Sequence, residues 1–462
     1  MAARDKVLPL VVAGPLFLQN LDSSAIATAL PAIAASLQVQ TLHLNLAITS
    51  YLLSLAVFLP VSGWFAGRFG ARRVFCAAIA LFTLGSALCG LAQSLPWLVA
   101  FRVLQGFGGA LMVPVARLVL LRSVQPAAMV AAMVWFTVPP TVGRMMGPLL
   151  GGAIVTWTSW RWIFLLNVPF GLLGIALAWR FIGTECDEEL REPFDARGSV
   201  LLALGLTGLL GALEMAGKGL IGGWAIAAAA GVGAMAMVIY VRRSRRMAAP
   251  LVNLDVLKIP TYFTSIVGGT PLRVAIGASP FLLPLMFQIG FGLSPLESGL
   301  LTVATAVGSL STRAVMGHAI HRFGFRSLLI CATALAAVVS MAYGLFRPDT
   351  PHLLMFCAMM FGGLVTSMAM VSMQTLGYSD IPKPLMSHAT TLSTMAQQVS
   401  MTFGVVLGAS LVSAASWWHG GDPAQLTARD FSPAFFVIGI TTLLSLFFFV
   451  RLDPEDGADM RR

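Results

Sequence analysis

Long apolar segments recur along the whole chain, separated by short polar stretches. Each runs to about 20 residues or more, which is the length that an α-helix needs to cross the hydrocarbon core of a bilayer. The pattern therefore predicts an all-α, polytopic membrane protein with fourteen transmembrane helices. The predicted helices cover residues 8–30, 45–66, 74–93, 96–121, 128–156, 161–182, 199–216, 222–241, 262–289, 297–319, 327–346, 351–376, 386–416 and 432–450.

One short motif occurs twice, each time between two apolar segments. Residues 68–72 read Arg-Phe-Gly-Ala-Arg, and residues 322–326 read Arg-Phe-Gly-Phe-Arg. A repeat in the same context predicts two related halves. In a membrane protein, two pseudo-symmetric halves are typical of a transporter whose substrate site lies between them. The copies follow the second and the tenth predicted helix, so the helices divide into six, two and six.

This layout divides the chain into six parts. The loops on one side of the predicted membrane hold most of the arginines, and this asymmetry places that side, with both termini, in the cytoplasm. The net charge of +10 then reflects orientation, and we expect no nucleic-acid partner. The parts are an N-terminal six-helix bundle (1–183), a cytoplasmic linker (184–198), two extra transmembrane helices (199–241), a second cytoplasmic linker (242–260), a C-terminal six-helix bundle (261–451) and a cytoplasmic tail (452–462).

The composition argues against a soluble enzyme. Only 10% of the residues are charged and 57% are hydrophobic, whereas soluble domains contain about 25% charged residues. The sequence has no phosphate loop, no metal-spaced Cys or His cluster and no Gly-x-Ser-x-Gly elbow. We expect no enzymatic activity, no metal and no cofactor, and an ion gradient rather than ATP as the energy source.

Two predicted helices carry polar residues at membrane depth. Asp22 lies inside the first predicted helix, and a carboxylate there is costly unless it faces a cavity or binds a partner. Such a group can take up a proton on one side and release it on the other; the alternative is a structural acid paired with arginine. Arg102 and Gln105 lie in the fourth helix. An always-charged arginine can tune a nearby acid, or it can simply bind backbone carbonyls.

Small residues recur every four positions in the fifth predicted helix, at Gly143, Gly147 and Gly151, with Pro148 and Gly152 beside them. The stripe lies on one helix face and allows close packing, which ordinary membrane helices also use. The proline can bend the helix. Further residues are candidates to line a substrate cavity, with lipid-facing, interfacial or structural positions as the alternative. They are Gln19, Asn20, Trp135, Phe136, Glu214 and Arg273.

Together these motifs resemble the major facilitator superfamily, and in particular its fourteen-helix drug:proton antiporter family of the QacA and EmrB type. The resemblance covers nearly the whole chain. It rests on residues 21–22 with 29–31, 63–73, 102–110, 143–152, and 160–164 with 167–169. The stretch 63–73 resembles the gating loop of the superfamily. Its positions are Gly63, Gly67, Arg68, Gly70, Arg72 and Arg73, and the second copy supplies Arg322, Gly324 and Arg326.

The resemblance implies a transporter that exports amphipathic or cationic drugs and other small organic compounds by proton antiport and alternating access. It implies proton coupling at Asp22, Arg102 and Gln105, and a place in the bacterial cytoplasmic membrane. We expect a monomer surrounded by lipid. Two alternatives stay open. One is a metabolite, amino-acid or siderophore transporter of the same superfamily, and the other is a transport-impaired membrane protein with a sensor or scaffold role.

Two positions depart from the family pattern. The gating loop usually carries an Asp where this chain has Gly67, and its loss is expected to weaken closure on the cytoplasmic side. The antiporter motif of the fifth helix usually carries a Pro where this chain has Arg144. A large cation in a close-packed stripe faces the cavity or disturbs the packing. One hypothesis is that Arg144 pairs with Asp22, which would favour the charged carboxylate and oppose proton coupling.

Overall fold

A computed structural model describes residues 3–39, 45–125, 128–183, 194–215, 222–247, 250–418 and 426–453. Within these ranges all regular secondary structure is helical. Eleven of the helices formed by these residues are long and apolar enough to cross a membrane. The predicted all-α, polytopic membrane architecture is confirmed, and the number of crossings, fourteen, stays a prediction.

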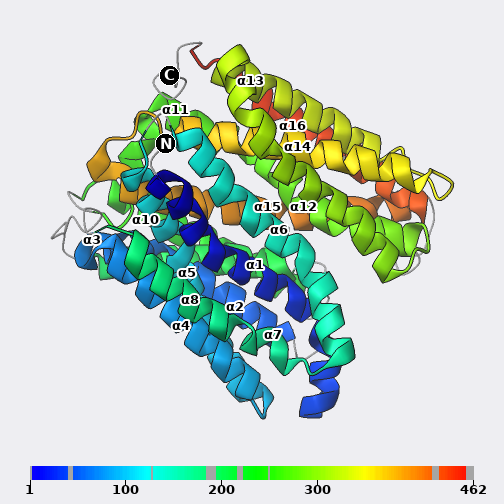
Figure 1. Ribbon diagram of the computed structural model, residues 1–462, viewed down its shortest axis with the longest axis horizontal. Coiled ribbons are helices and arrows are strands. Elements are labelled where there is room, and N and C mark those ends of the chain that lie inside the picture. The colour runs from blue at the N-terminus through cyan, green and yellow to red at the C-terminus, as the bar shows by residue number, and fades with distance from the viewer. Residues whose placement is uncertain are drawn as a thin grey trace.

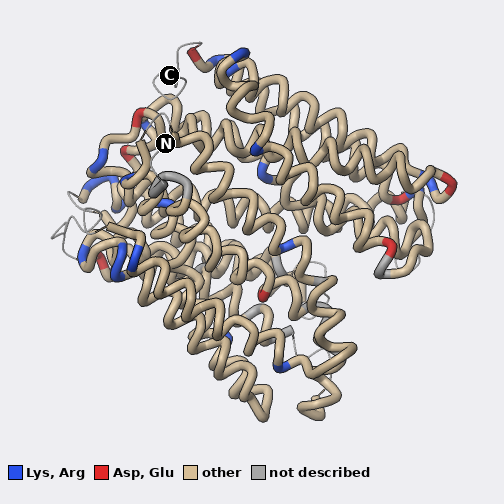
Figure 2. The backbone as a smooth tube through the Cα atoms, in the orientation of Figure 1, with Lys and Arg blue, Asp and Glu red and all other residues tan. Residues whose placement is uncertain are grey.

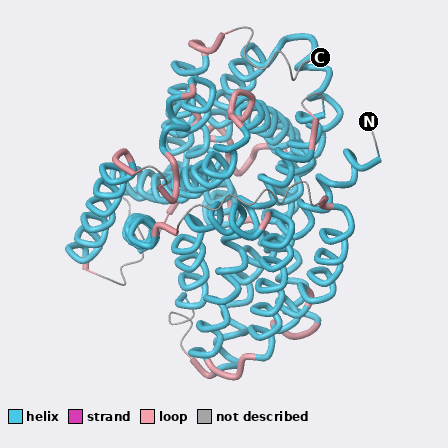
Figure 3. The backbone as a smooth tube through the Cα atoms, turned by 90° about the vertical axis from the view of Figure 1, so that its left-hand side faces the viewer, coloured by secondary structure: helices cyan, strands magenta, loops and turns pink. Residues whose placement is uncertain are grey.

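Most predicted segments begin and end within about four residues of the observed helices, whereas the first helix, residues 3–37, begins five residues before and ends seven residues after its predicted segment 8–30. The first group consists of α1 (Ala3–Leu37), α2 (Asn45–Phe58), α3 (Ser62–Phe69), α4 (Ala71–Leu91), α5 (Leu95–Ser123), α6 (Met129–Trp157), α7 (Arg161–Leu165) and α8 (Asn167–Phe181). An antiparallel pair follows, α9 (Ala196–Met215) and α10 (Gly223–Ser244). After η5 (Leu254–Lys258) and α11 (Pro260–Phe263), the second group consists of α12 (Thr270–Leu285), α13 (Pro295–Tyr343), α14 (His352–Gly377), α15 (Met386–Trp418) and α16 (Ala428–Phe449). The π-helical turns η6 (Thr264–Gly268) and η7 (Met286–Gly290) flank α12, and Figure 3 shows that the loops are short.

The two groups meet at one end of the molecule and diverge toward the other (Figure 1). We call the end where the two groups meet the basic end, because lysines and arginines gather there (Figure 2). The helix α1 begins and α16 ends at this end. Other helix ends at the basic end carry Arg72, Arg122, Arg243 and Arg326. The helix α9 packs against α2 and α15 and so lies beside the junction between the groups.

The buried core follows the same division. The largest apolar cluster contains residues of both groups, such as Phe75 and Val115 with Tyr262 and Phe449, and these lie toward the basic end. Toward the opposite end the apolar clusters are separate. One packs Ile26 and Phe164 inside the first group, and another packs residues 275–287 with 431–438 inside the second. Among the described residues, the two groups share the largest cluster and a smaller one that packs Leu59 and Ala110 with Met395.

The repeated motif adopts the same conformation in both copies. Gly70 separates α3 from α4 with φ 85° and ψ 140°, and Gly324 interrupts α13 with φ 76° and ψ 166°. Both angles lie in a region that only glycine enters readily. The guanidinium of Arg72 stacks 4.2 Å from the ring of Trp179 in α8, and Arg326 donates to the carbonyl of Val450 after α16 at 2.7 Å. The break at Gly324 divides α13 into the two segments that the sequence predicted.

The positive φ at Gly70 gives a direct test of this loop. Replacing Gly70 with alanine should lower the free energy of unfolding by about 1–3 kcal/mol, because a side chain strains this backbone conformation. Thermal unfolding of the purified chain in detergent measures the effect. Gly152→Ala is the control, since a Cβ at Gly152 meets no atom within 4 Å. Equal unfolding temperatures for the two variants would contradict the assignment.

Candidate functional site

The three predicted proton-coupling residues meet in the interior of the first group. Arg102 donates from Nη1 to Oδ2 of Asp22 at 2.8 Å and to Oε1 of Gln105 at 2.7 Å. Gln105 donates to the same oxygen of Asp22 at 3.2 Å. All three side chains are fully buried. The helices α1 and α5 are thus joined by an ion pair that is closed to solvent.

Asn167 completes this cluster from α8. Its Nδ2 donates to Oδ1 of Asp22 and to Oγ of Ser86, both at 2.9 Å, so both carboxylate oxygens accept hydrogen bonds. Asn167 belongs to the sequence motif 167–169, but its contact with Asp22 was not predicted. An amide inside an apolar segment is the signal that would have identified it, because a buried amide requires partners.

The surroundings of Arg102 explain how a charge is tolerated here. Its Nε donates to the carbonyl of Ala47 at 3.2 Å, and its guanidinium lies 4.2 Å from the ring of Tyr51, which adds a cation–π contact. Glycines bring the helices close enough for these bonds. A Cβ at Gly85 would lie 2.7 Å from the main chain of Gln105. The cluster therefore depends on close packing of α2, α4 and α5.

The chemistry available to this cluster is the gain and loss of one proton. A buried ion pair persists when hydrogen bonds satisfy its charges. Here both carboxylate oxygens of Asp22 accept hydrogen bonds, whereas Nη2 of Arg102 has no hydrogen-bond partner among the described residues. A proton on Asp22 would remove the charge to which Arg102 is bonded and change the bonding with α5 and α8. The site can thus link protonation to the contacts between three helices.

The glycine stripe of α6 faces α1. A Cβ at Gly143 would lie 2.5 Å from the carbonyl of Phe17, and one at Gly147 would lie 2.9 Å from the carbonyl of Leu21. Gly151 is buried, and Gly152 has open space around its Cβ position. The side chain of Pro148 lies outside the described residues. Two of the stripe glycines therefore provide close packing between α1 and α6.

Arg144 bonds to a neutral partner and not to Asp22. Its Nη2 and Nε donate to Oδ1 of Asn20 at 2.8 and 3.2 Å, and its Nη1 lies 3.8 Å from the sulfur of Met401 in α15. The side chain is exposed. Within the described part of the chain no bond joins Arg144 to Asp22, whose ion-pair partner is Arg102. The hypothesis of an Asp22–Arg144 pair does not hold in this conformation.

A second polar cluster joins the two groups toward the basic end. Arg117 of α5 is 2% exposed and donates to four neutral oxygens of the second group. Arg117 was not among the predicted site residues, although an arginine in the apolar run 111–121 was a visible signal. Its acceptors are Tyr378 Oη at 3.2 Å, Ser393 Oγ at 3.1 Å, and Thr394 Oγ1 and Gln397 Oε1, each at 3.4 Å.

The start of the gating loop lies at the same junction. Ser387 of α15 donates to the carbonyl of Gly63 at 2.9 Å, and the hydroxyls of Ser62 and Thr391 are 3.4 Å apart. A Cβ at Gly63 would lie 2.8 Å from Thr391 Oγ1. Gly63 therefore permits α3 and α15 to touch, and Gly67 is buried four residues further along α3.

Comparison with known proteins places the chain in a family. Residues 15–242 and 266–459 match the Major Facilitator Superfamily. The chain is also 36% identical over 450 residues to a protein of Salmonella paratyphi A named "Putative multidrug resistance protein MdtD", covering 97% of this chain and 95% of that protein. The chain belongs to the major facilitator superfamily. It is a transporter of small molecules in a membrane, and not an enzyme.

Solved structures of this superfamily share the fold. The human organic anion transporter MFSD10 (TETRAN) superimposes with a TM-score of 0.62 at 14% identity, covering 97% of this chain and 100% of that one. The proton:xylose symporter XylE superimposes with a TM-score of 0.65 at 16% identity, covering 99% and 97%. Transporters of this superfamily generally need no cofactor, and the described residues contain no group of three metal-ligating side chains.

The predicted cavity residues lie in different surroundings. Gln19 is buried and donates to the carbonyl of Gly109 at 3.3 Å. Arg273 is buried and donates to two carbonyls of the π-helical turn η6. The side chain of Glu214 lies outside the described residues. Trp135 and Phe136 lie against Arg313 at 4.2 Å and Arg117 at 5.4 Å, respectively.

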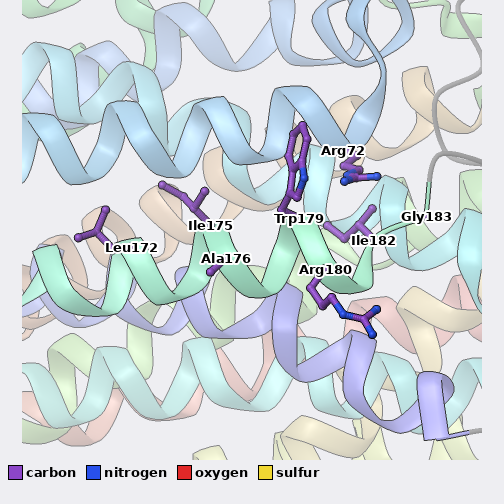
Figure 4. A pocket seen from close by; sticks show the side chains of 8 residues that line it. All are labelled: Arg72, Leu172, Ile175, Ala176, Trp179, Arg180, Ile182 and Gly183. Atoms are coloured by element: carbon purple, nitrogen blue, oxygen red, sulfur yellow. The ribbon is translucent and has the colours of Figure 1, made fainter.

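A groove on the outer side of α8 is separate from both clusters. It is lined by Arg72 and Trp179 at one end and by Leu172 and Ile175 further along the helix (Figure 4). Arg180 also lines the groove, and its side chain leaves α8 on the side opposite that of Trp179 (Figure 4). Arg68, Arg73 and Arg322 are exposed at the basic end. None of these side chains contacts Asp22 within the described part of the chain.

The role of Asn167 in holding Asp22 can be measured. Asn167→Ala should reduce the free energy of unfolding by about 1–3 kcal/mol, because it leaves one buried carboxylate oxygen without its donor. Thermal unfolding in detergent checks this. Thr141→Ala is a suitable control, since Thr141 is exposed and donates only to a carbonyl of its own helix. If both variants unfold at the wild-type temperature, Asn167 does not support the buried pair.

Proposed function

We propose that this transporter exports amphipathic small organic compounds in exchange for protons, by alternating access. The observation that carries the proposal is the fully buried Asp22–Arg102 pair at 2.8 Å. An ionisable residue at this depth in a transporter marks a pathway for ions or substrate. The similarity to a protein named for multidrug resistance supports small organic compounds as the substrate class.

The proposed orientation places the basic end in the cytoplasm of a bacterium, with the chain in the inner membrane. The gathering of arginines at that end supports this orientation, because cytoplasmic loops carry an excess of Lys and Arg. Fourteen crossings in an arrangement of six, two and six put both termini on that side. The shared core and the polar junction then close the cytoplasmic side, so this conformation faces outward.

The proposed cycle uses Asp22 as the proton carrier. A proton that arrives from outside neutralises Asp22 and weakens its bond with Arg102, and substrate leaves to the outside. The contacts of Arg117 and of Ser62 with α15 then break, and the cytoplasmic side opens. Asp22 releases its proton there, the pair with Arg102 re-forms, and substrate binds again from the cytoplasm or inner leaflet.

A proton gradient supplies enough energy for this cycle. One proton moving inward provides about 2.3 kcal/mol per 100 mV of membrane potential and about 1.4 kcal/mol per pH unit. About 1.4 kcal/mol corresponds to a tenfold ratio. A potential of about 100 mV together with a difference of about one pH unit therefore sustains a concentration ratio of a neutral compound on the order of a hundredfold.

Asp22→Asn should abolish substrate-evoked proton movement, because an amide cannot carry the proton. The measurement is the quenching of a pH-sensitive dye in proteoliposomes, with a panel of amphipathic drugs and dyes as substrates. Asp195→Asn is the control. It also removes a buried carboxylate, which is paired with Arg243 at 3.0 Å but lies at the start of α9, away from the cluster.

Two results would overturn the proposal. One is proton movement that persists in Asp22→Asn, which would exclude this residue as the carrier. The other is the absence of any substrate-evoked proton movement in the wild type across the panel. Thermal unfolding of each variant shows whether a loss of activity reflects a loss of folding.

Crosslinking tests the proposed alternating access. Cysteines introduced together as Ser62→Cys and Thr391→Cys, in a chain without its native cysteines, should react with a short bifunctional thiol reagent and stop transport. The reason is that the junction between α3 and α15 must separate in each cycle. Thiol reduction should restore transport when the crosslinker contains a disulfide. Transport that continues after complete crosslinking would show that the junction between α3 and α15 does not need to separate in the cycle.

The control crosslink lies at the basic end but within the C-terminal part of the chain. Thr261 donates to Asp380 at 2.8 Å, and neither residue belongs to the first group. Thr261→Cys with Asp380→Cys should crosslink without stopping transport, because this contact does not need to separate in the proposed cycle.

A further inference from the structure

Four arginines lie where the two groups face one another or close behind that surface. They are Arg117, Arg144, Arg273 and Arg313. Their polar partners among the described residues are all neutral: hydroxyls, amides, main-chain carbonyls, a thioether and aromatic rings. The buried carboxylates among the described residues bind other partners, and Asp430 accepts from Thr427 at the start of α16. Asp22 binds Arg102, and Asp195 binds Arg243.

The helix α15 shows how closely two of these cations are spaced. Arg117 bonds to Gln397, and Arg144 contacts Met401. These two partners are four residues apart on α15, so they lie about 6 Å apart along the helix axis. Arg117 belongs to the closed junction, and Arg144 is exposed. A buried arginine at the junction, Arg117, and an exposed arginine, Arg144, therefore lie close to the same stretch of α15.

Aromatic rings border the same charges on α6. The ring of Phe136 lies 5.4 Å from the guanidinium of Arg117, and the ring of Trp135 lies 4.2 Å from that of Arg313. Arg144 is two turns further along α6. Phe136 is 3% exposed and belongs to the shared core, whereas Trp135 is half-buried, so of these two rings that of Trp135 is the accessible one.

The arginines of this surface favour an anionic substrate over a cationic or a neutral one. A guanidinium at membrane depth without a counter-ion is costly, and it binds a carboxylate through two parallel hydrogen bonds. A cationic compound would be repelled by several arginines in a region of low dielectric constant. A neutral compound would leave the charges uncompensated.

We infer that the substrates of the proposed exporter are amphipathic organic carboxylates, whose anionic group binds Arg144 beside Met401 of α15. This inference rests on the proposed function and names its substrate class. It narrows the amphipathic or cationic compounds that the family resemblance implied to one charge class.

An anionic substrate also changes how the membrane potential acts. With one proton per cycle, export of a monovalent anion moves two positive charges inward, export of a neutral compound moves one, and export of a monovalent cation moves none. The potential therefore drives the anion most strongly and leaves the cation unaffected. This difference separates the substrate classes without any structural assumption.

Binding is tested with three probes that share one ring system: 1-naphthylacetate, its methyl ester and 1-naphthylmethylamine. The acid should raise the unfolding temperature of the purified full-length chain, and the ester and amine should not. Arg144→Gln should weaken the apparent affinity for the acid roughly tenfold or more, as loss of a charge-assisted hydrogen bond does. Arg144→Lys should recover part of it.

Arg161→Gln is the matched control, since Arg161 bonds to Ser36 and Ala92 at the opposite end and should leave the affinity for the acid unchanged. Unfolding temperatures without probe show whether each variant folds. The inference is overturned if the acid gives no shift, if the ester or the amine gives an equal shift, or if Arg144→Gln binds the acid as the wild type does.

Transport in proteoliposomes separates this inference from the proposed function. An inside-negative potential set by potassium and valinomycin should accelerate export of the acid more than export of the ester. If the ester or the amine evokes proton movement that depends on Asp22 while the acid does not, antiport stands and the carboxylate class is wrong. If the acid is exported with no dependence on Asp22, the substrate class stands and proton antiport is wrong.

Discussion

The need to pair charges inside an apolar medium governs this structure. Lipid provides no hydrophobic force between helices, so association depends on close packing and polar bonds. The Asp22–Arg102 pair links α1 to α5, and Asn167 and Ala47 extend the bonding to α8 and α2. Removing one partner of a buried pair costs about 3–5 kcal/mol. The site that can carry a proton is thus also what holds these helices in register.

The junction between the two groups follows the opposite principle. Its bonds are numerous but neutral or singly charged, such as Ser62 with Thr391 and Arg117 with hydroxyls of α15. Neutral hydrogen bonds contribute about 0.5–1.5 kcal/mol each, so a set of them can break and re-form in a cycle. The buried position of Gly67 supplies no carboxylate to this end. Closure there rests on the shared apolar core and on the bonds of Arg117.

The sequence was sufficient for the features that each segment determines by itself. Apolar length predicted the helices, the repeat predicted a break at Gly324, and membrane depth marked Asp22 and Arg102 as residues in need of partners. The missed features depend on how the helices are rotated about their axes. The contact of Asn167 with Asp22 depends on the rotation of α8 about its axis. The bond of Arg144 to Asn20, and not to Asp22, depends on the rotations of α1 and α6. None of these rotations is encoded in the pattern of one segment.

In the proposed exporter, these rotations put the substrate-binding and proton-binding contacts on different faces of one helix. Asn20 and Asp22 are two residues apart in α1, which separates their side chains by about 200° around the axis. Asn20 accepts from Arg144, and Asp22 accepts from Arg102. Under the proposal, an anion that competes with Asn20 for Arg144 would break the contact on one face of α1, and a proton on Asp22 would weaken the contact on the other. Coupling then needs no direct contact between substrate and proton, because both act on the position of α1 between α5 and α6.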